Sequence, residues 1–192
     1  METNELYFKP EDFTVERESP KPDLPGWKIL IVDDEPDIHR TTRFVLKDFE
    51  FEGQGLWFLS AYSGEEALEI MRSHRDIAVV LLDVVMETSH AGLDCAREIR
   101  ENLKNRLVRI ILRTGQPGEA PERQVIIDYD INDYKHKTEL TAQRLFTAVY
   151  TGIRSYRDMA SIEKNRQGLK YIIEASGDFS KQQSVKKLGK GV

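Results

Sequence analysis

The sequence has few of the features that mark secreted or membrane proteins. Its 192 residues include a single cysteine, Cys95, which excludes a disulfide framework within the chain and a metal site built from several cysteines. No run approaches the roughly 18 apolar residues that a membrane-spanning helix needs. The first residues, Met-Glu-Thr-Asn, lack the basic start and apolar run of a secretory signal. These absences predict a cytoplasmic protein with no membrane contact.

Basic charge and nucleotide-binding motifs are missing as well. The net charge is −5, and no basic face typical of nucleic-acid binding is evident, so direct contact with nucleic acid is not expected. No glycine-rich phosphate loop is present, which argues against ATP binding. The four histidines show no metal-ligand spacing. The 40% hydrophobic and 32% charged residues are instead typical of an ordinary soluble globular domain.

From residue 28 onward, short apolar runs alternate with segments of helical periodicity. Residues 1–26, which are polar and contain four prolines, are expected to form a flexible extension. The apolar runs read as strands buried on both faces, and Ser63 with Glu66 forms a capping-box pattern for one of the helices. The expected strands are 28–32, 56–61, 77–82, 108–112 and 131–135. The alternation predicts an α/β fold with a doubly wound parallel sheet.

Polar residues follow these strands where a ligand site is expected in such a sheet, beyond the carboxyl ends. Asp33 and Asp34 follow the first strand, Asp83 the third and Thr114 the fourth, and Lys137 comes just after the fifth. Three close carboxylates repel one another unless a divalent cation compensates, and Mg²⁺ prefers such hard oxygen ligands. Asp83 could then attack a phosphoryl donor, while Lys137 and Thr114 bind phosphoryl oxygens. Each residue alone is commonly a cap, turn or surface residue, and only the joint pattern carries this interpretation.

The same segments resemble the receiver domain of two-component response regulators over about residues 27–154. The resemblance lies in residues 29–35, 79–86, 110–115 and 133–137. It implies a flavodoxin-like, five-stranded parallel sheet with helices on both faces. It implies that Asp33, Asp34 and Asp83 hold Mg²⁺ together with the backbone carbonyl of Val85. Asp83 would accept a phosphoryl group from a histidine kinase or phosphotransfer protein.

The resemblance also implies a conformational switch, in which the Thr114 hydroxyl moves toward the phosphate and the Tyr134 ring turns inward. The residue after Lys137 departs from the family pattern, because Thr138 stands where the family usually has proline. Lys135 is the alternative for the lysine role, although its spacing from Tyr134 fits the pattern poorly.

The loop after Asp83 departs too. Glu87 follows Met86 in place of the usual proline, and Gly92 comes one residue late. The longer loop either alters kinase specificity or phosphate lifetime, or is a tolerated insertion.

Beyond the receiver, apolar residues recur at helical spacing from 140 to 160, and 169–179 forms a second helical patch. The first segment predicts an extended C-terminal helix that could pair with its twin in a homodimer. Residues 165–176 resemble the start of a sensor-like domain of unknown function that often precedes an HD-GYP-type cyclic-di-GMP phosphodiesterase in bacterial regulators. We therefore expect a receiver domain at 27–154, followed at 155–192 by a linker helix and the truncated start of a second domain.

The favoured interpretation is a signalling switch that dephosphorylates itself slowly, with any catalytic output domain outside this chain. One alternative is a receiver-like interaction module that is not phosphorylated. Another is a phosphatase with Asp83 as nucleophile, for which Glu87 is the only nearby unassigned acid.

Overall fold

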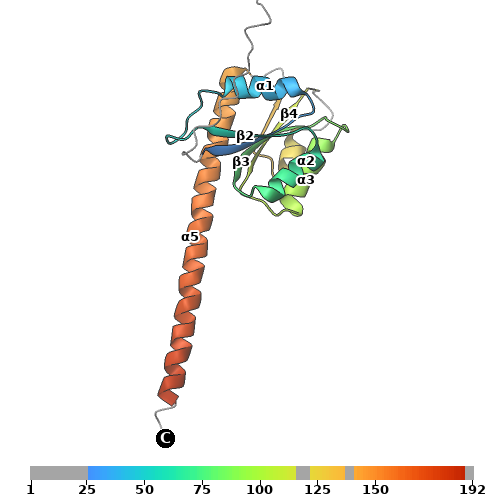
Figure 1. Ribbon diagram of the computed structural model, residues 1–192. Coiled ribbons are helices and arrows are strands. Elements are labelled where there is room, and N and C mark those ends of the chain that lie inside the picture. The colour runs from blue at the N-terminus through green and yellow to red at the C-terminus, as the bar shows by residue number, and fades with distance from the viewer. Residues whose placement is uncertain (1–25, 116–121, 137–140, 189–192) are drawn as a thin grey trace, which may run out of the picture.

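The computed structural model describes residues 26–115, 122–136 and 141–188, and its centre is a five-stranded parallel sheet (Figure 1). The sheet order is β2-β1-β3-β4-β5, so the chain winds outward in both directions from the middle. This confirms the predicted doubly wound fold. Almost all of the predicted flexible extension lies outside the described residues. The strands are β1 (Trp27–Val32), β2 (Leu56–Ala61), β3 (Ile77–Asp83), β4 (Arg109–Thr114) and β5 (Asp133–His136).

Helices cover the two faces of the sheet, and two separate hydrophobic clusters lie beneath them. Helices α1 and α5 lie on one face, and α2 and α3 lie on the other (Figure 1). Strand β3 is buried throughout, as expected for a continuous apolar run at the centre of a parallel sheet. The helices are α1 (Pro36–Val45), α2 (Gly64–Ser73), α3 (Ala91–Glu101), α4 (Glu122–Asp128) and α5 (Ala142–Leu188).

Local signals explain where several elements begin. Ser63 caps α2, because its hydroxyl accepts a hydrogen bond from the Glu66 N–H at 3.2 Å. The Glu66 carboxylate accepts from the N–H of Tyr62, one residue before the position that a capping box requires. Strand β5 begins two residues later than predicted, because the Ile131 N–H still bonds to the Ile126 carbonyl at the end of α4.

Helix α5 is 47 residues long and continues far past the sheet (Figure 1). The sequence indicates two helical segments here, whereas the structure joins them into one. Gly168 lies between them without ending the helix. A single interior glycine costs only about 1 kcal/mol relative to alanine, and Leu169 and Lys170 after it favour helix. Among the described helices, none combines the length and apolar content that a membrane span requires.

Candidate functional site

Three charged side chains form a row at the carboxyl ends of neighbouring strands. Val32 pairs with Leu82, so Asp33 and Asp83 follow at adjacent positions of β1 and β3, and Asp83 itself pairs with Arg113 of β4. All three residues are buried, with relative exposures of 0%, 2% and 3%. We call Asp33, Asp83 and Arg113 the charged row. Buried charges in such a row must compensate one another or bind an ion, because isolated buried charges are costly.

Asp33 is fixed by contacts at both of its carboxylate oxygens. Oδ1 accepts a hydrogen bond from the Glu35 N–H at 3.1 Å, and Oδ2 lies 3.2 Å from Nη2 of Arg113. The Asp33 carbonyl oxygen accepts from Nε2 of His39 at 2.8 Å, which requires the proton on Nε2. Nδ1 on the other side of the His39 ring lies 2.9 Å from the Ser60 hydroxyl oxygen. The first acidic residue after β1 is thus held rigidly from three sides.

The carboxylates beside the row could hold a cation. Oxygens of Asp33, Asp34 and Glu35 all lie within 4.8 Å of one another, with Asp34 and Glu35 exposed. Hard carboxylate oxygens are the ligands that Mg²⁺ takes, so the residues fit that ion. From the sequence, Asp83 was expected in this set and Glu35 was not. Val85, whose carbonyl was expected to be a ligand, is half-buried two residues after Asp83.

Arg113 belongs to the charged row, although the sequence did not single it out. Its Nη1 donates to the Thr42 hydroxyl of α1 at 3.3 Å, and its Nη2 reaches Asp33. Nε has no hydrogen-bond partner among the described residues. Burial lowers the pKa of the guanidinium, whereas the negative charges of Asp33 and Asp83 raise it. The available signal was a charged residue directly after the apolar, buried run 110–112 of β4.

The predicted switch residues are only partly described. Thr114 is the last residue of β4 and is 2% exposed. Because side chains alternate along a strand, Thr114 and Arg113 project to opposite faces of the sheet. Tyr134 pairs with Leu112 through the β5 backbone. Lys137, like Thr138 after it, lies outside the described residues.

The loop after Asp83 is held by Gly92 and Glu87. A Cβ on Gly92 would lie 1.8 Å from the carbonyl oxygen of Asp83, so only glycine fits there. The Gly92 N–H donates to the Val84 carbonyl at 3.1 Å. The Glu87 carboxylate accepts from the Gly64 N–H at 2.9 Å, at the amino end of α2. The later glycine therefore still packs against the Asp83 backbone. An effect of the longer loop on kinase specificity or phosphate lifetime stays a prediction.

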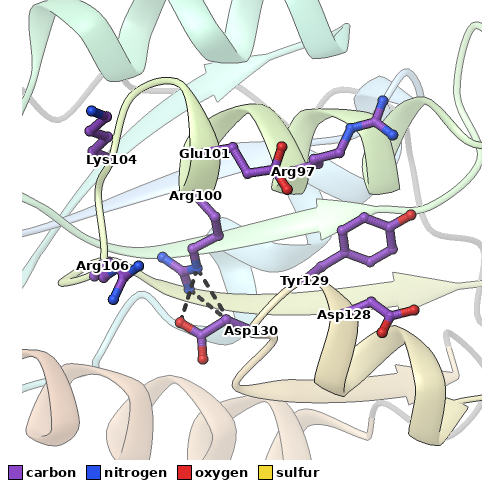
Figure 2. Close-up of a pocket in the computed structure, with 8 residues that line it drawn as sticks. All are labelled: Arg97, Arg100, Glu101, Lys104, Arg106, Asp128, Tyr129 and Asp130. Carbon is purple, nitrogen blue, oxygen red and sulfur yellow. Dashed lines mark hydrogen bonds and ion pairs between the residues drawn. The ribbon is translucent and has the colours of Figure 1, made fainter.

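A cavity of about 870 Å³ lies elsewhere, between α3, the loop before β4 and the end of α4 (Figure 2). Its central cation, Arg100, donates to the carbonyl oxygens of Asn105, Val108 and Asp130. Burial lowers the pKa of Arg100 to about 10. The hydrogen bonds of this guanidinium therefore connect the loop before β4 to the loop after α4. The cavity also lies at the amino ends of the strands, opposite the charged row.

Comparisons with known proteins agree with this geometry. The family model described as the response regulator receiver domain matches residues 29–150, and a domain of unknown function, DUF3369, matches residues 149–192. A curated relative from Vibrio cholerae serotype O1, the 3'3'-cGAMP-specific phosphodiesterase 2, is 50% identical over 159 residues, which is 83% of this chain. The chain spans only 30% of that relative's length.

Solved structures show the same fold. A response regulator receiver domain protein from Clostridium thermocellum is 28% identical, with a TM-score of 0.58. The match covers 69% of this chain and 98% of that one. A CheY-like receiver domain protein from Methanospirillum hungatei is 17% identical, with a TM-score of 0.57. It covers 70% of this chain and 99% of that one.

Proposed function

The chain belongs to the response regulator receiver family, and from this premise we propose that Asp83 is its phosphoacceptor. The observation that carries the proposal is the burial of Asp83 at the end of the central strand, inside the charged row. A carboxylate oxygen of Asp83 bonds to phosphorus as the phosphorus–nitrogen bond of the partner's phosphohistidine breaks. The donor imidazole leaves and the product is an aspartyl phosphate. The partner is a histidine kinase or a phosphotransfer protein.

The proposal includes Mg²⁺ bound by Asp33, Asp34 and Asp83 with the Val85 carbonyl. Support comes from the cluster of carboxylate oxygens around Asp33, and Glu35 is a further candidate in that cluster. When bound, the ion supplies positive charge that offsets carboxylate repulsion and attracts the phosphoryl group. The fixed Asp33 carboxylate orients this site.

The switch is assigned to Thr114, Lys137 and Tyr134. A phosphoryl group on Asp83 adds charge and acceptor oxygens at one point, and the Thr114 hydroxyl and Lys137 ammonium pair with it in only one arrangement of their loops. Phosphorylation then shifts an existing equilibrium between two arrangements, with Tyr134 following.

We assign no substrate turnover to this chain beyond slow loss of its own phosphate. Glu87, the acid considered for phosphatase chemistry, is engaged by the N–H of Gly64. The phosphodiesterase relative supports an output domain that acts on a cyclic dinucleotide and lies outside this chain. The receiver then spans 27–154, and residues 155–192 form a linker helix and the start of a second domain. A cytoplasmic location, where the phosphodonor acts, completes the proposal.

A homodimer through α5 is part of the same proposal. Beyond the sheet, α5 has an apolar stripe at alternating spacings of three and four residues, which is the pattern of a helix that pairs with a copy of itself. The stripe consists of Met159, Ile162, Leu169 and Ile173, which are 37%, 66%, 60% and 70% exposed. Arg166 interrupts it and forms an ion pair with Glu163.

The test is phosphorylation by acetyl phosphate, followed by intact-protein mass. We expect a Mg²⁺-dependent gain of one phosphoryl group in the wild type and its loss in Asp83→Asn. Asp76→Asn is the matched control, because Asp76 lies exposed just before the other end of β3 and should leave the gain intact. A gain that persists in Asp83→Asn would refute the assignment. If the wild type gains no phosphoryl group and does not bind fluoroberyllate, the chain is an interaction module.

A further inference from the structure

Arg113 is a buried cation placed among the carboxylates of the proposed phosphorylation site. It starts on β4, next to the strand that carries Asp83, and its guanidinium reaches Asp33, which directly follows β1, one strand further across the sheet. The side chain therefore passes the position of Asp83. The charges of both aspartates raise the pKa of Arg113 against the effect of burial.

Packing alone does not account for an arginine at this position. Ile111, two residues earlier on the same face of β4, fills the space beneath α5 as part of the apolar cluster. Burying a guanidinium carries a large desolvation cost, which an apolar side chain avoids. Nε of Arg113 also has no hydrogen-bond partner within the described residues. The compensation that the structure offers is the negative charge of Asp33 and Asp83.

We propose that Arg113 is a resident counter-cation, which compensates the negative charge of Asp33 before a divalent ion arrives and so weakens the binding of that ion. The first effect follows from the 3.2 Å contact between Nη2 and Oδ2 of Asp33. The second follows because two cations that share the same carboxylates repel each other. Thr42 holds the other end of the guanidinium through its hydroxyl, which keeps the positive charge fixed. The inference rests on the proposed function, because it takes the acidic pocket to be the metal site.

A positioning residue and a counter-cation predict opposite results when Arg113 is neutralised. If Arg113 only held Asp33 in the correct geometry, its loss would weaken ion binding. If it acts through its charge, its loss removes the repulsion and leaves Asp33 without its cation, and both effects strengthen ion binding.

The experiment is calorimetric titration of Mg²⁺, with Mn²⁺ as a second probe, into the apo protein without any phosphodonor. We expect Arg113→Gln to bind Mg²⁺ about tenfold more tightly than the wild type, which corresponds to about 1.4 kcal/mol. Arg113→Lys keeps the charge and should stay within about threefold of the wild type. Equal or weaker binding by Arg113→Gln overturns the inference, as does equally tightened binding by both variants.

Failure of the inference is distinguishable from failure of the proposed function. Equal Mg²⁺ affinity in the wild type and Arg113→Gln removes the counter-cation role and leaves the metal site intact. Absence of binding in both proteins overturns the inference together with the magnesium part of the proposed function. Phosphorylation of Asp83 is judged separately by the mass experiment.

A second measurement uses the wild type alone and does not depend on whether Arg113→Gln folds. Because Arg113 already compensates Asp33, the melting temperature should rise by less than about 3 °C between excess chelator and 1 mM Mg²⁺, as expected for weak binding to a preformed pocket. A larger rise would show that the pocket depends on the ion for its stability, and would overturn the inference.

Discussion

At the scale of single residues, Gly92 connects the loop after Asp83 to the backbone of Asp83 itself. An added Cβ would lie 1.8 Å from the Asp83 carbonyl oxygen and 2.8 Å from Cα of Val84. Both contacts are with backbone atoms, so no side-chain rotation can relieve them. The glycine is thus required by close approach and not by an unusual backbone angle.

We expect Gly92→Ala to lower the free energy of unfolding by roughly 3 kcal/mol or more, because the chain around Asp83 must shift. Urea denaturation measures this change. Gly168→Ala is the matched control, since no atom lies within 4 Å of its Cβ position in the middle of α5. That change should be neutral or stabilise the helix by up to about 1 kcal/mol. Similar effects in both variants would contradict the assigned role of Gly92.

Cys95 is a second residue whose environment makes a measurable prediction. Burial raises the pKa of its thiol to about 12, with Glu87 and Glu98 adding to the shift. Well below pH 9.0 the thiol is protonated in both the folded and unfolded chains and contributes no pH dependence. Between pH 9.0 and about 12 the unfolded chain releases the proton first, so stability falls by up to about 1.4 kcal/mol per pH unit.

Urea denaturation of the wild type and Cys95→Ala across this range isolates the effect. The difference between the two proteins should shrink as pH rises above 9, because only the wild type carries the thiol penalty. A difference that is independent of pH would show that the thiol ionises normally in the folded chain.

For single residues, the sequence was sufficient to place the acidic residues at the strand ends, but it was not sufficient to predict which side chains contact one another. Asp33 and Asp83 were located because each follows a continuous apolar run that reads as a buried strand. The contact of Arg113 with Asp33 was missed because it joins residues 80 positions apart and requires the order and register of three strands. The roles assigned to the site residues remain predictions.

At the scale of elements, contacts at the end of the sheet fix the direction in which α5 leaves. The Tyr156 ring packs edge-on against Trp27 at 6.5 Å between centroids, and Trp27 packs against Phe51 at 5.7 Å. The Trp27 indole N–H donates to the Phe51 carbonyl at 3.1 Å. Arg157 adds an ion pair with Glu52. The helix is thus attached to the domain at the point where it begins to project.

We expect Tyr156→Ala to lower the free energy of unfolding by about 1–3 kcal/mol, because a half-buried aromatic contact is lost. Tyr171→Ala on the same helix is the matched control. Its side chain is 72% exposed, and the change should stay within about 0.5 kcal/mol. Equal losses in the two variants, measured by urea denaturation, would mean that Tyr156 does not anchor α5.

The continuity of α5 shows why element boundaries were harder to predict than element types. Apolar spacing identified helix on both sides of Gly168, and the five strands were recognised from their apolar runs. The two segments were not joined because residues 163–168 between them carry no apolar side chain. Apolar spacing alone does not show that a helix continues through a stretch without apolar residues.

At the scale of the whole molecule, the projecting half of α5 exposes an apolar stripe. An isolated helix with such a stripe gains stability by packing it against a partner. We expect the chain to form a concentration-dependent dimer in light scattering. Ile162→Glu with Leu169→Glu should yield a monomer, because carboxylates would face each other across the paired helices.

Lys164→Glu with Gln167→Glu adds two carboxylates on the opposite side of the same helix, and this control should remain dimeric. Both stripe residues are more than half exposed, so their loss does not disturb the domain itself. A wild type that is monomeric at every concentration, or a control that dissociates equally, would refute pairing through the stripe.

The unbroken course of α5 sets a rule for the spacing between the receiver and whatever follows it. Each residue of an α-helix advances the chain by about 1.5 Å and turns it by about 100°, so 47 residues form a rod of about 70 Å. Inserting one residue beyond Tyr156 would swing everything downstream a quarter-turn or more around the axis, whereas inserting seven would return it almost to its original heading. The number of residues in this helix therefore determines the angle at which the downstream segment is oriented relative to the receiver.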